Sequence, residues 1–80
     1  MNRAVLRLRA EAEGIRETAY CLDGGMPPET YVLAIEDGGW SVYYSERGSR
    51  VGEARYDTED EACSDLLLRL VNDPTIRKHA

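Results

Sequence analysis

Residues 30–56, TYVLAIEDGGWSVYYSERGSRVGEARY, carry the clearest structural pattern in the sequence. Apolar and polar residues alternate on both sides of Asp37-Gly38, which is the pattern of half-buried β-strands. Asp-Gly favours a two-residue type I′ turn, and this turn places Ile35 opposite Trp40. In this register all the large side chains of the two strands share one face of the sheet. They are Tyr31, Leu33, Ile35, Trp40, Val42 and Tyr44.

A second turn is predicted within residues 46–50, and the alternation indicates its length. A two-residue loop would place Glu53 on the buried face, so we predict an odd loop of three or five residues that aligns Val42 with Ala54. Such a loop needs a left-handed residue near its end, either Gly48 or Ser49. A short strand is also expected within residues 18–23, before a Gly-Gly and Pro-Pro loop at residues 24–28. These segments predict an antiparallel meander of three to four strands.

Two helices flank the meander. The first is expected over residues 3–13 and ends at Gly14, and the second begins at Thr58, which forms a capping box with Glu61 and precedes a stop at Asn72-Asp73-Pro74. The apolar stripe expected to face the sheet is Ala4, Val5, Leu8 and Ala12, with Met1, in the first helix. In the second helix it is Ala62, Cys63, Leu66, Leu67, Leu70 and Val71.

The element order predicts an α+β fold: a two-layer sandwich of helix, three- to four-stranded antiparallel meander and helix, with both helices on one sheet face. Eighty residues are enough for one modest core. We therefore expect residues 1–74 to form a single domain and residues 75–80 to form a flexible C-terminal tail.

Charge is distributed unevenly along the chain. The net charge is −5 overall and −9 across residues 17–65, whereas both ends are weakly basic. Because phosphate binding draws on clustered Lys and Arg, this pattern disfavours nucleic acid and favours a basic protein partner. The sequence shows neither an apolar run that could span a membrane nor a secretory signal, so we expect a cytoplasmic protein with no membrane partner.

The acidic, cysteine and histidine residues that could act in catalysis or metal binding have structural explanations in this sequence. Glu36 and Asp37 bracket a turn, and residues 59–61 supply carboxylates to the first turn of a helix. Cys21 and Cys63 lack metal-ligand spacing and are expected to be reduced thiols, with Cys63 in the core, while His79 falls in the predicted tail. We therefore expect a protein that is not an enzyme, with no catalytic residues, no metal and no cofactor.

The sheet face away from the helices is the candidate contact surface. It is predicted to present Tyr43 among small side chains, with Glu53 and Arg55, and aromatic and Arg residues are enriched at protein interfaces. The alternative is that Tyr43 only pairs across strands. Glu46 and Arg47, in the second turn, either contact a partner or pin the hairpin to Gly24-Gly25.

Four stretches resemble a family of small bacterial immunity proteins from polymorphic toxin systems: YCLDGG (20–25), ETYVL (29–33), WSVYYSERG (40–48) and YDTEDEAC (56–63). The resemblance covers about residues 14–71. It implies inhibition by stoichiometric binding, in which an acidic protein blocks a cognate toxin domain that is often a nuclease with a basic active site.

The competing interpretation is a small self-associating adaptor or structural domain with no toxin partner. It would form a homodimer through Leu68, which projects away from the second helix's apolar stripe, or through the Tyr43 face. The sequence therefore predicts a protein-binding domain that is either a monomer or a homodimer.

Overall fold

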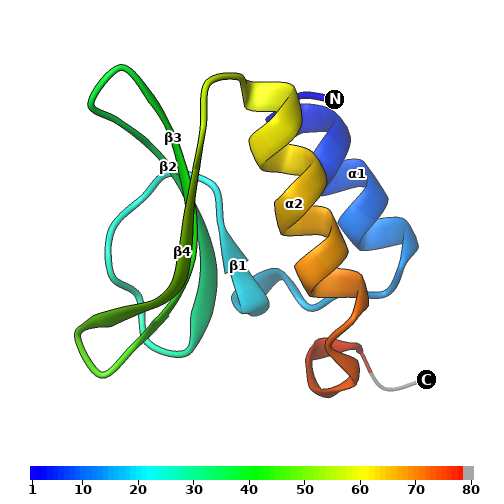
Figure 1. The fold of residues 1–80 in the computed structure, drawn as a ribbon. Coiled ribbons are helices and arrows are strands. Elements are labelled where there is room, and N and C mark those ends of the chain that lie inside the picture. The colour runs from blue at the N-terminus through cyan, green and yellow to red at the C-terminus, as the bar shows by residue number, and fades with distance from the viewer. Residues whose placement is uncertain (79–80) are drawn as a thin grey trace.

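Two α-helices and a four-stranded mixed sheet make up the fold in a computed structural model that describes residues 1–78 (Figure 1). The prediction of an α+β fold is confirmed. The elements, in chain order, are α1 (Arg3–Ala12), a 3₁₀ turn (Glu17–Ala19), β1 (Tyr20–Cys21), β2 (Thr30–Glu36), β3 (Gly39–Glu46), β4 (Ser49–Tyr56), α2 (Glu59–Val71) and a second 3₁₀ turn (Pro74–Ile76).

The strands lie in the order β1-β2-β3-β4, and the first pair is parallel. Tyr20 lies beside Tyr31, and the two strands run in the same direction because the connection of residues 22–29 returns the chain to the level at which β1 began. The prediction of an antiparallel sheet throughout is therefore wrong for β1. The remaining pairs are antiparallel.

The β2–β3 hairpin has the predicted register. Leu33 lies opposite Val42 and Ile35 opposite Trp40. Asp37 and Gly38 both have positive φ, 53° and 75°, as a type I′ turn requires.

The β3–β4 turn is shorter than predicted. Arg47 and Gly48 form a two-residue loop between Glu46 and Ser49, so the prediction of an odd loop is wrong. The register then shifts by one residue within β4. The shift follows the Tyr44–Val51 pair, where Gly52 adopts φ 64° in a β-bulge. Because of the bulge, Val42 still lies opposite Ala54, and an acid is kept off the buried face as the alternation demands.

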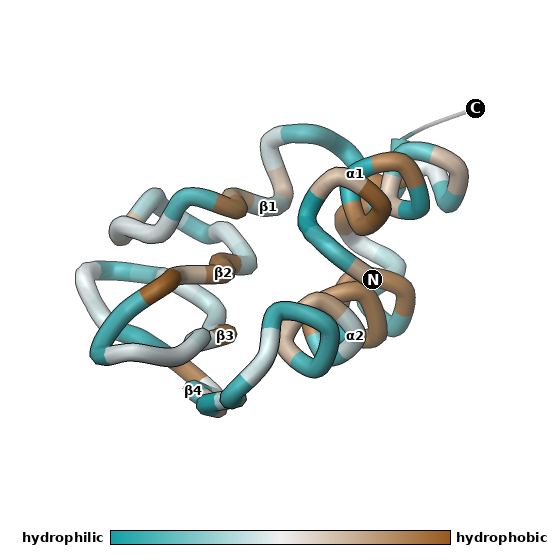
Figure 2. The backbone as a smooth tube through the Cα atoms, turned by 90° about the horizontal axis from the view of Figure 1, so that it is seen from above, coloured by the Kyte–Doolittle hydropathy of each residue, from teal (hydrophilic) through white to brown (hydrophobic). Residues whose placement is uncertain are grey.

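Both helices lie on the same side of the sheet (Figures 1 and 2). α1 buries Leu6 and Ala10, whereas Leu8, in the stripe predicted to face inward, is 67% exposed. The predicted face of this helix is therefore wrong. The helix carries two apolar stripes, and packing against α2 selects the one that contains Leu6 and Ala10.

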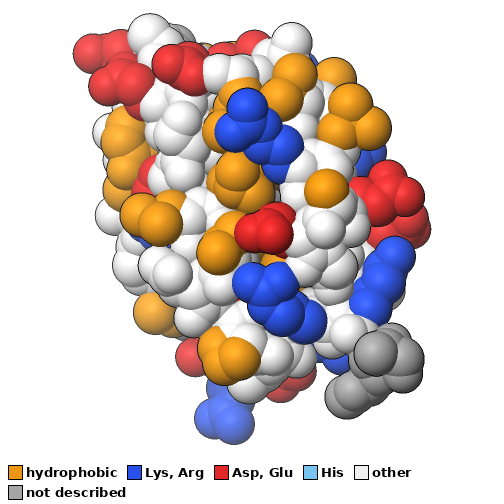
Figure 3. All heavy atoms as spheres, turned by 90° about the vertical axis from the view of Figure 1, so that its right-hand side faces the viewer, with side chains coloured by type: hydrophobic (Ala, Val, Ile, Leu, Met, Phe, Trp, Pro, Cys, Tyr) orange, Lys and Arg blue, Asp and Glu red, His pale blue; other side chains and the backbone are white. Residues whose placement is uncertain are grey.

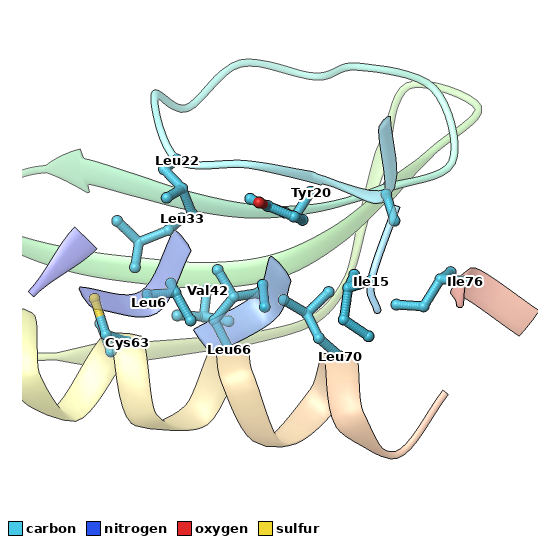
Figure 4. Close-up of a cluster of buried hydrophobic side chains, with 13 residues drawn as sticks. Leu6, Ile15, Tyr20, Leu22, Leu33, Val42, Cys63, Leu66, Leu70 and Ile76 are labelled. Carbon is cyan, nitrogen blue, oxygen red and sulfur yellow. The ribbon is translucent and has the colours of Figure 1, made fainter. Parts of the chain in front are cut away.

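α2 follows the prediction closely. The amide of Glu61 donates to Thr58 Oγ1 at 3.2 Å, which confirms the N-cap. Leu66 meets Leu6 of α1 and Val42 of β3 in the core (Figure 4). Cys63 is fully buried, as predicted.

The C-terminal segment packs against the domain as far as the structure describes it. Ile76 is 7% exposed, its carbonyl oxygen accepts from the Arg16 amide at 2.9 Å, and the Lys78 amide donates to Gly14 O at 2.6 Å. Residues 75–78 thus differ from the expected flexible tail, because the buried Ile76 and these backbone bonds fix them. The rest of that predicted tail, including His79, lies outside the described residues.

Candidate functional site

Tyr43 does not lie on an open surface. It is fully buried, and its hydroxyl donates to Gly25 O at 2.7 Å. Gly25 belongs to the connection between β1 and β2, which lies on the side of the sheet away from the helices (Figure 1). The prediction that Tyr43 is exposed on this face is therefore wrong, and Tyr43 instead holds this connection to the sheet.

Several further bonds fix the covering segment, residues 22–29. The Gly24 amide donates to Leu33 O at 3.0 Å, and the Thr30 hydroxyl donates to Pro28 O at 2.7 Å. Beneath the segment, Val32 and Ala34 are buried with Tyr43 in a second small core. This cover has no hydrophobic periodicity, so the sequence carries no signal from which its position could be predicted.

A charged cluster closes the rest of this face. Arg50 donates through both terminal nitrogens to the Glu36 carboxylate, at 2.5 and 3.0 Å, and also to Glu53 at 2.5 Å. Its guanidinium carbon lies 4.1 Å from the centroid of the Tyr43 ring. Arg55 donates to Ser41 Oγ and to Glu36 O, both at 2.8 Å. Two of the predicted contact residues, Glu53 and Arg55, thus lie together in one network.

Glu36 and Arg50 are members of the network that sequence reasoning missed. Alternation along residues 30–36 could have placed Glu36 on the Tyr43 face, beyond Val32 and Ala34. Arg50 could not be placed, because its position opposite Ser45 depends on the length of the second turn.

Hydrogen bonds within the network fix its ionisation. Those that Arg50 donates lower the pKa of Glu36 to about 2, with a smaller contribution from Ser41. The same carboxylates raise the pKa of Arg50, and burial raises the pKa of Tyr43. Glu36 and Arg50 therefore stay charged at neutral pH, and each is hydrogen-bonded to the other. The network lies over this face of the sheet, and its Glu36–Arg50 pair offers no free general acid or base.

The two turn residues, Glu46 and Arg47, lie apart from this network. They occupy the β3–β4 turn, where Arg47 is exposed with φ 50°. Within residues 1–78, neither side chain makes a hydrogen bond or an ion pair, so the structure does not show the predicted link to Gly24-Gly25.

An acidic hollow of about 200 Å³ lies where the β2–β3 turn meets the end of β4 and the start of α2. Its three carboxylates, from Asp37, Asp57 and Glu61, make no ion pair with any described residue. Arg55 lines the hollow too, although its nitrogens are engaged by Ser41 and Glu36. Red side chains gather along the same end of the molecule, at the top of Figure 3. This arrangement suits the ammonium or guanidinium group of a partner.

A second hollow, of about 340 Å³, lies between α1, residues 22–25 and the end of β2. Its titratable groups are Arg3, Asp23 and Glu36, and Glu36 is already bound by Arg50. Among residues 1–78, no group of three or more His, Cys, Asp or Glu side chains could hold a metal ion. Neither helix of this part of the chain is long and apolar enough to cross a bilayer.

Comparison of the chain with protein-family models, with curated proteins and with solved structures finds no match.

Proposed function

We propose that this chain is a non-catalytic binding protein that neutralises a cognate toxin domain by stoichiometric binding, as a bacterial immunity protein acting in the cytoplasm. The observation that carries the proposal is the acidic hollow, whose carboxylates at Asp37, Asp57 and Glu61 have no cationic partner within residues 1–78. A Lys or Arg side chain at a toxin's nucleic-acid-binding surface would supply that partner.

The charge distribution supports a basic protein as the occupant. The net charge of −9 across residues 17–65 attracts a cationic domain over distances of about 8–10 Å at physiological salt, which raises the rate of productive encounter. The same charge repels nucleic acid. An acidic inhibitor of this kind would occupy the surface that a nuclease uses for phosphates.

The contact surface we propose is centred on the hollow and extends along the neighbouring edge of β4. Arg55 lines the hollow, and Glu53 lies in the same strand. Glu46 and Arg47 would belong to the contact only if the partner reached the β3–β4 turn. Tyr43 acts on this surface indirectly, by holding the charged cluster and the connection over the sheet.

The test uses the purified product of the gene adjacent to the one that encodes this chain. We expect a 1:1 complex by titration calorimetry and suppression of that product's toxicity on co-expression. The variant D37N/D57N/E61Q should bind at least tenfold more weakly. A matched variant, E17Q/D23N/E29Q, removes the same charge elsewhere and should lose less. Absence of a complex, or equal losses in the two variants, would contradict the proposal.

The second candidate is the self-associating adaptor without a toxin. The observation that favours it is the exposure of large apolar side chains on the helices, with Leu68 at 59%. The Tyr43 face is buried and is not available for this purpose. An adaptor would leave the adjacent gene product unbound and non-toxic.

A further inference from the structure

α1 carries an apolar stripe on its outer side, and most of this stripe is exposed. The stripe lies on the side of the helix away from Leu6 and Ala10. Its members Ala4, Leu8 and Ala12 are exposed, and Val5 is half-buried. Leu8, at its centre, is 67% exposed, which is more than any other large apolar residue described. Orange side chains are visible among charged ones on this outer side of the helices (Figure 3). Contiguous exposed apolar patches are one signature of a protein contact surface.

Charges flank the stripe in a regular order. Arg7 and Glu11 lie on one flank and Arg9 and Glu13 on the other, each Arg four residues before its Glu. This spacing allows ion pairs within a helix, yet none of these four side chains makes an ion pair with any residue in 1–78. Arg before Glu is the weaker orientation for such pairs within one helix. The four charged groups are therefore free for a partner.

The order of the charges selects one kind of partner. In an antiparallel pair of identical helices related by a two-fold axis, each flank faces the same flank of the other copy. The N-terminal half of that flank in one copy then meets the C-terminal half of the same flank in the other copy. Arg7 of each copy therefore meets Glu11 of the other. A parallel pair would instead set Arg against Arg and Glu against Glu.

We propose that two copies of this chain associate through α1, packed antiparallel, with Leu8 at the centre and reciprocal Arg7–Glu11 ion pairs at one flank. None of the residues that line the acidic hollow belongs to α1. The dimer thus leaves the proposed toxin-binding surface free, and it stands or falls independently of that function.

The first test is the mass in solution. Sedimentation equilibrium measures it at protein concentrations from about 1 to about 500 µM, a range that covers tight and weak dimers. We expect the wild type to approach twice 9.0 kDa, and Leu8→Glu to remain at 9.0 kDa throughout. Ile35→Glu is the matched control, because Ile35 is 60% exposed but lies on β2, and it should dimerise like the wild type. Circular dichroism should show that all three are folded, since neither substituted side chain is buried.

The second test reverses the charges. Arg7→Glu and Glu11→Arg should each weaken the dimer at least tenfold, because each sets like charges opposite one another. An equimolar mixture of these two variants should regain a dimer, since every pair across the two copies is again opposite in sign. A wild type that stays at 9.0 kDa would overturn the proposal, as would an unchanged Leu8→Glu dimer or a mixture that stays monomeric.

Discussion

Tyr43 joins two segments that are unrelated in the sequence. Its ring lies under residues 22–29 and the Arg50 guanidinium, and its hydroxyl reaches the carbonyl of Gly25. An exposed aromatic on a strand and a buried one look the same in a sequence, because alternation reports which face a side chain is on and not what covers that face. The covering loop decides the role of the residue.

Removing the Tyr43 hydroxyl tests this role. Tyr43→Phe keeps the ring but leaves the Gly25 carbonyl without its donor, which should lower the free energy of unfolding by about 1–2 kcal/mol. Urea denaturation followed by Trp40 fluorescence measures the change. Tyr44→Phe is the control, since the Tyr44 hydroxyl makes no hydrogen bond within residues 1–78 and its loss should have little effect. Equal losses in both variants would show that the Gly25 bond contributes nothing.

The Glu36–Arg50 pair predicts a specific dependence of stability on pH. The pKa of Glu36 falls from 4.5 to about 2 on folding, because Arg50 donates hydrogen bonds to the charged carboxylate. Its stabilising contribution is therefore complete above about pH 4.5 and is lost as the pH falls towards 2. Glu36→Gln should melt below the wild type at pH 7, and the difference should shrink across this window.

Arg50→Gln provides the matched variant for this prediction. It removes the other half of the same pair, so its melting temperature should also converge with that of the wild type as the pH falls from 4.5 towards 2. Thermal melts followed by circular dichroism from pH 2 to 7 measure both curves. A gap between wild type and either variant that is as large at pH 2 as at pH 7 would contradict the assignment.

At the scale of elements, the sequence predicts best where the signal is local. The β2–β3 register follows from Asp37-Gly38 and from alternation over a few residues, and the α2 N-terminus follows from Thr58 and Glu61. The β3–β4 turn was mispredicted because a bulge at Gly52 absorbs the residue that the odd loop was meant to supply. A bulge and a longer loop give the same register downstream, so the pattern of side chains cannot distinguish them.

Long-range choices between similar surfaces escape the same reasoning. α1 has two apolar stripes, and only the position of α2 decides that Leu6 is buried and Leu8 is exposed. Which residues lie beside Asp37 and Asp57 in the candidate site is likewise set by how the β2–β3 turn, β4 and α2 meet. The negative charge of this surface can be predicted from the sequence, but the hollow that its carboxylates line cannot.

The C-terminal segment gives a prediction at the element scale. Ile76 joins the core with Ile15, and the Ile76 carbonyl is bonded to the Arg16 amide, so this short segment closes one end of the domain. Ile76→Ala should lower the free energy of unfolding by about 2 kcal/mol or more, through lost burial and a residual cavity. Leu68→Ala, at a site 59% exposed, should change it by less than about 0.5 kcal/mol in denaturant titrations. Similar small effects in both would mean that residues 75–78 do not contribute to the fold.

At the scale of the whole molecule, both sheet faces are covered, one by the helices and the other by residues 22–29 and the Arg50 cluster. Two features of the described surface carry the proposals for a partner: the acidic hollow, and the stripe on α1. The hollow has the charge of an inhibitor surface, and the stripe has the self-complementary order of a dimer contact. Each can be removed without disturbing the core.

Charge over the whole molecule and charge inside the hollow should affect binding differently, and this separates them kinetically. Carboxylates remote from the contact act through the long-range field, so E17Q/D23N/E29Q should lower the association rate with the adjacent gene product by about threefold to tenfold and leave dissociation unchanged. Raising the salt should remove this difference, because screening shortens the field. Carboxylates in the hollow would also contact the bound cation, so D37N/D57N/E61Q should accelerate dissociation as well, and this acceleration should persist at high salt. Surface plasmon resonance at two ionic strengths resolves both rates. A hollow variant that alters only association would mean that the partner is steered by these carboxylates but binds elsewhere.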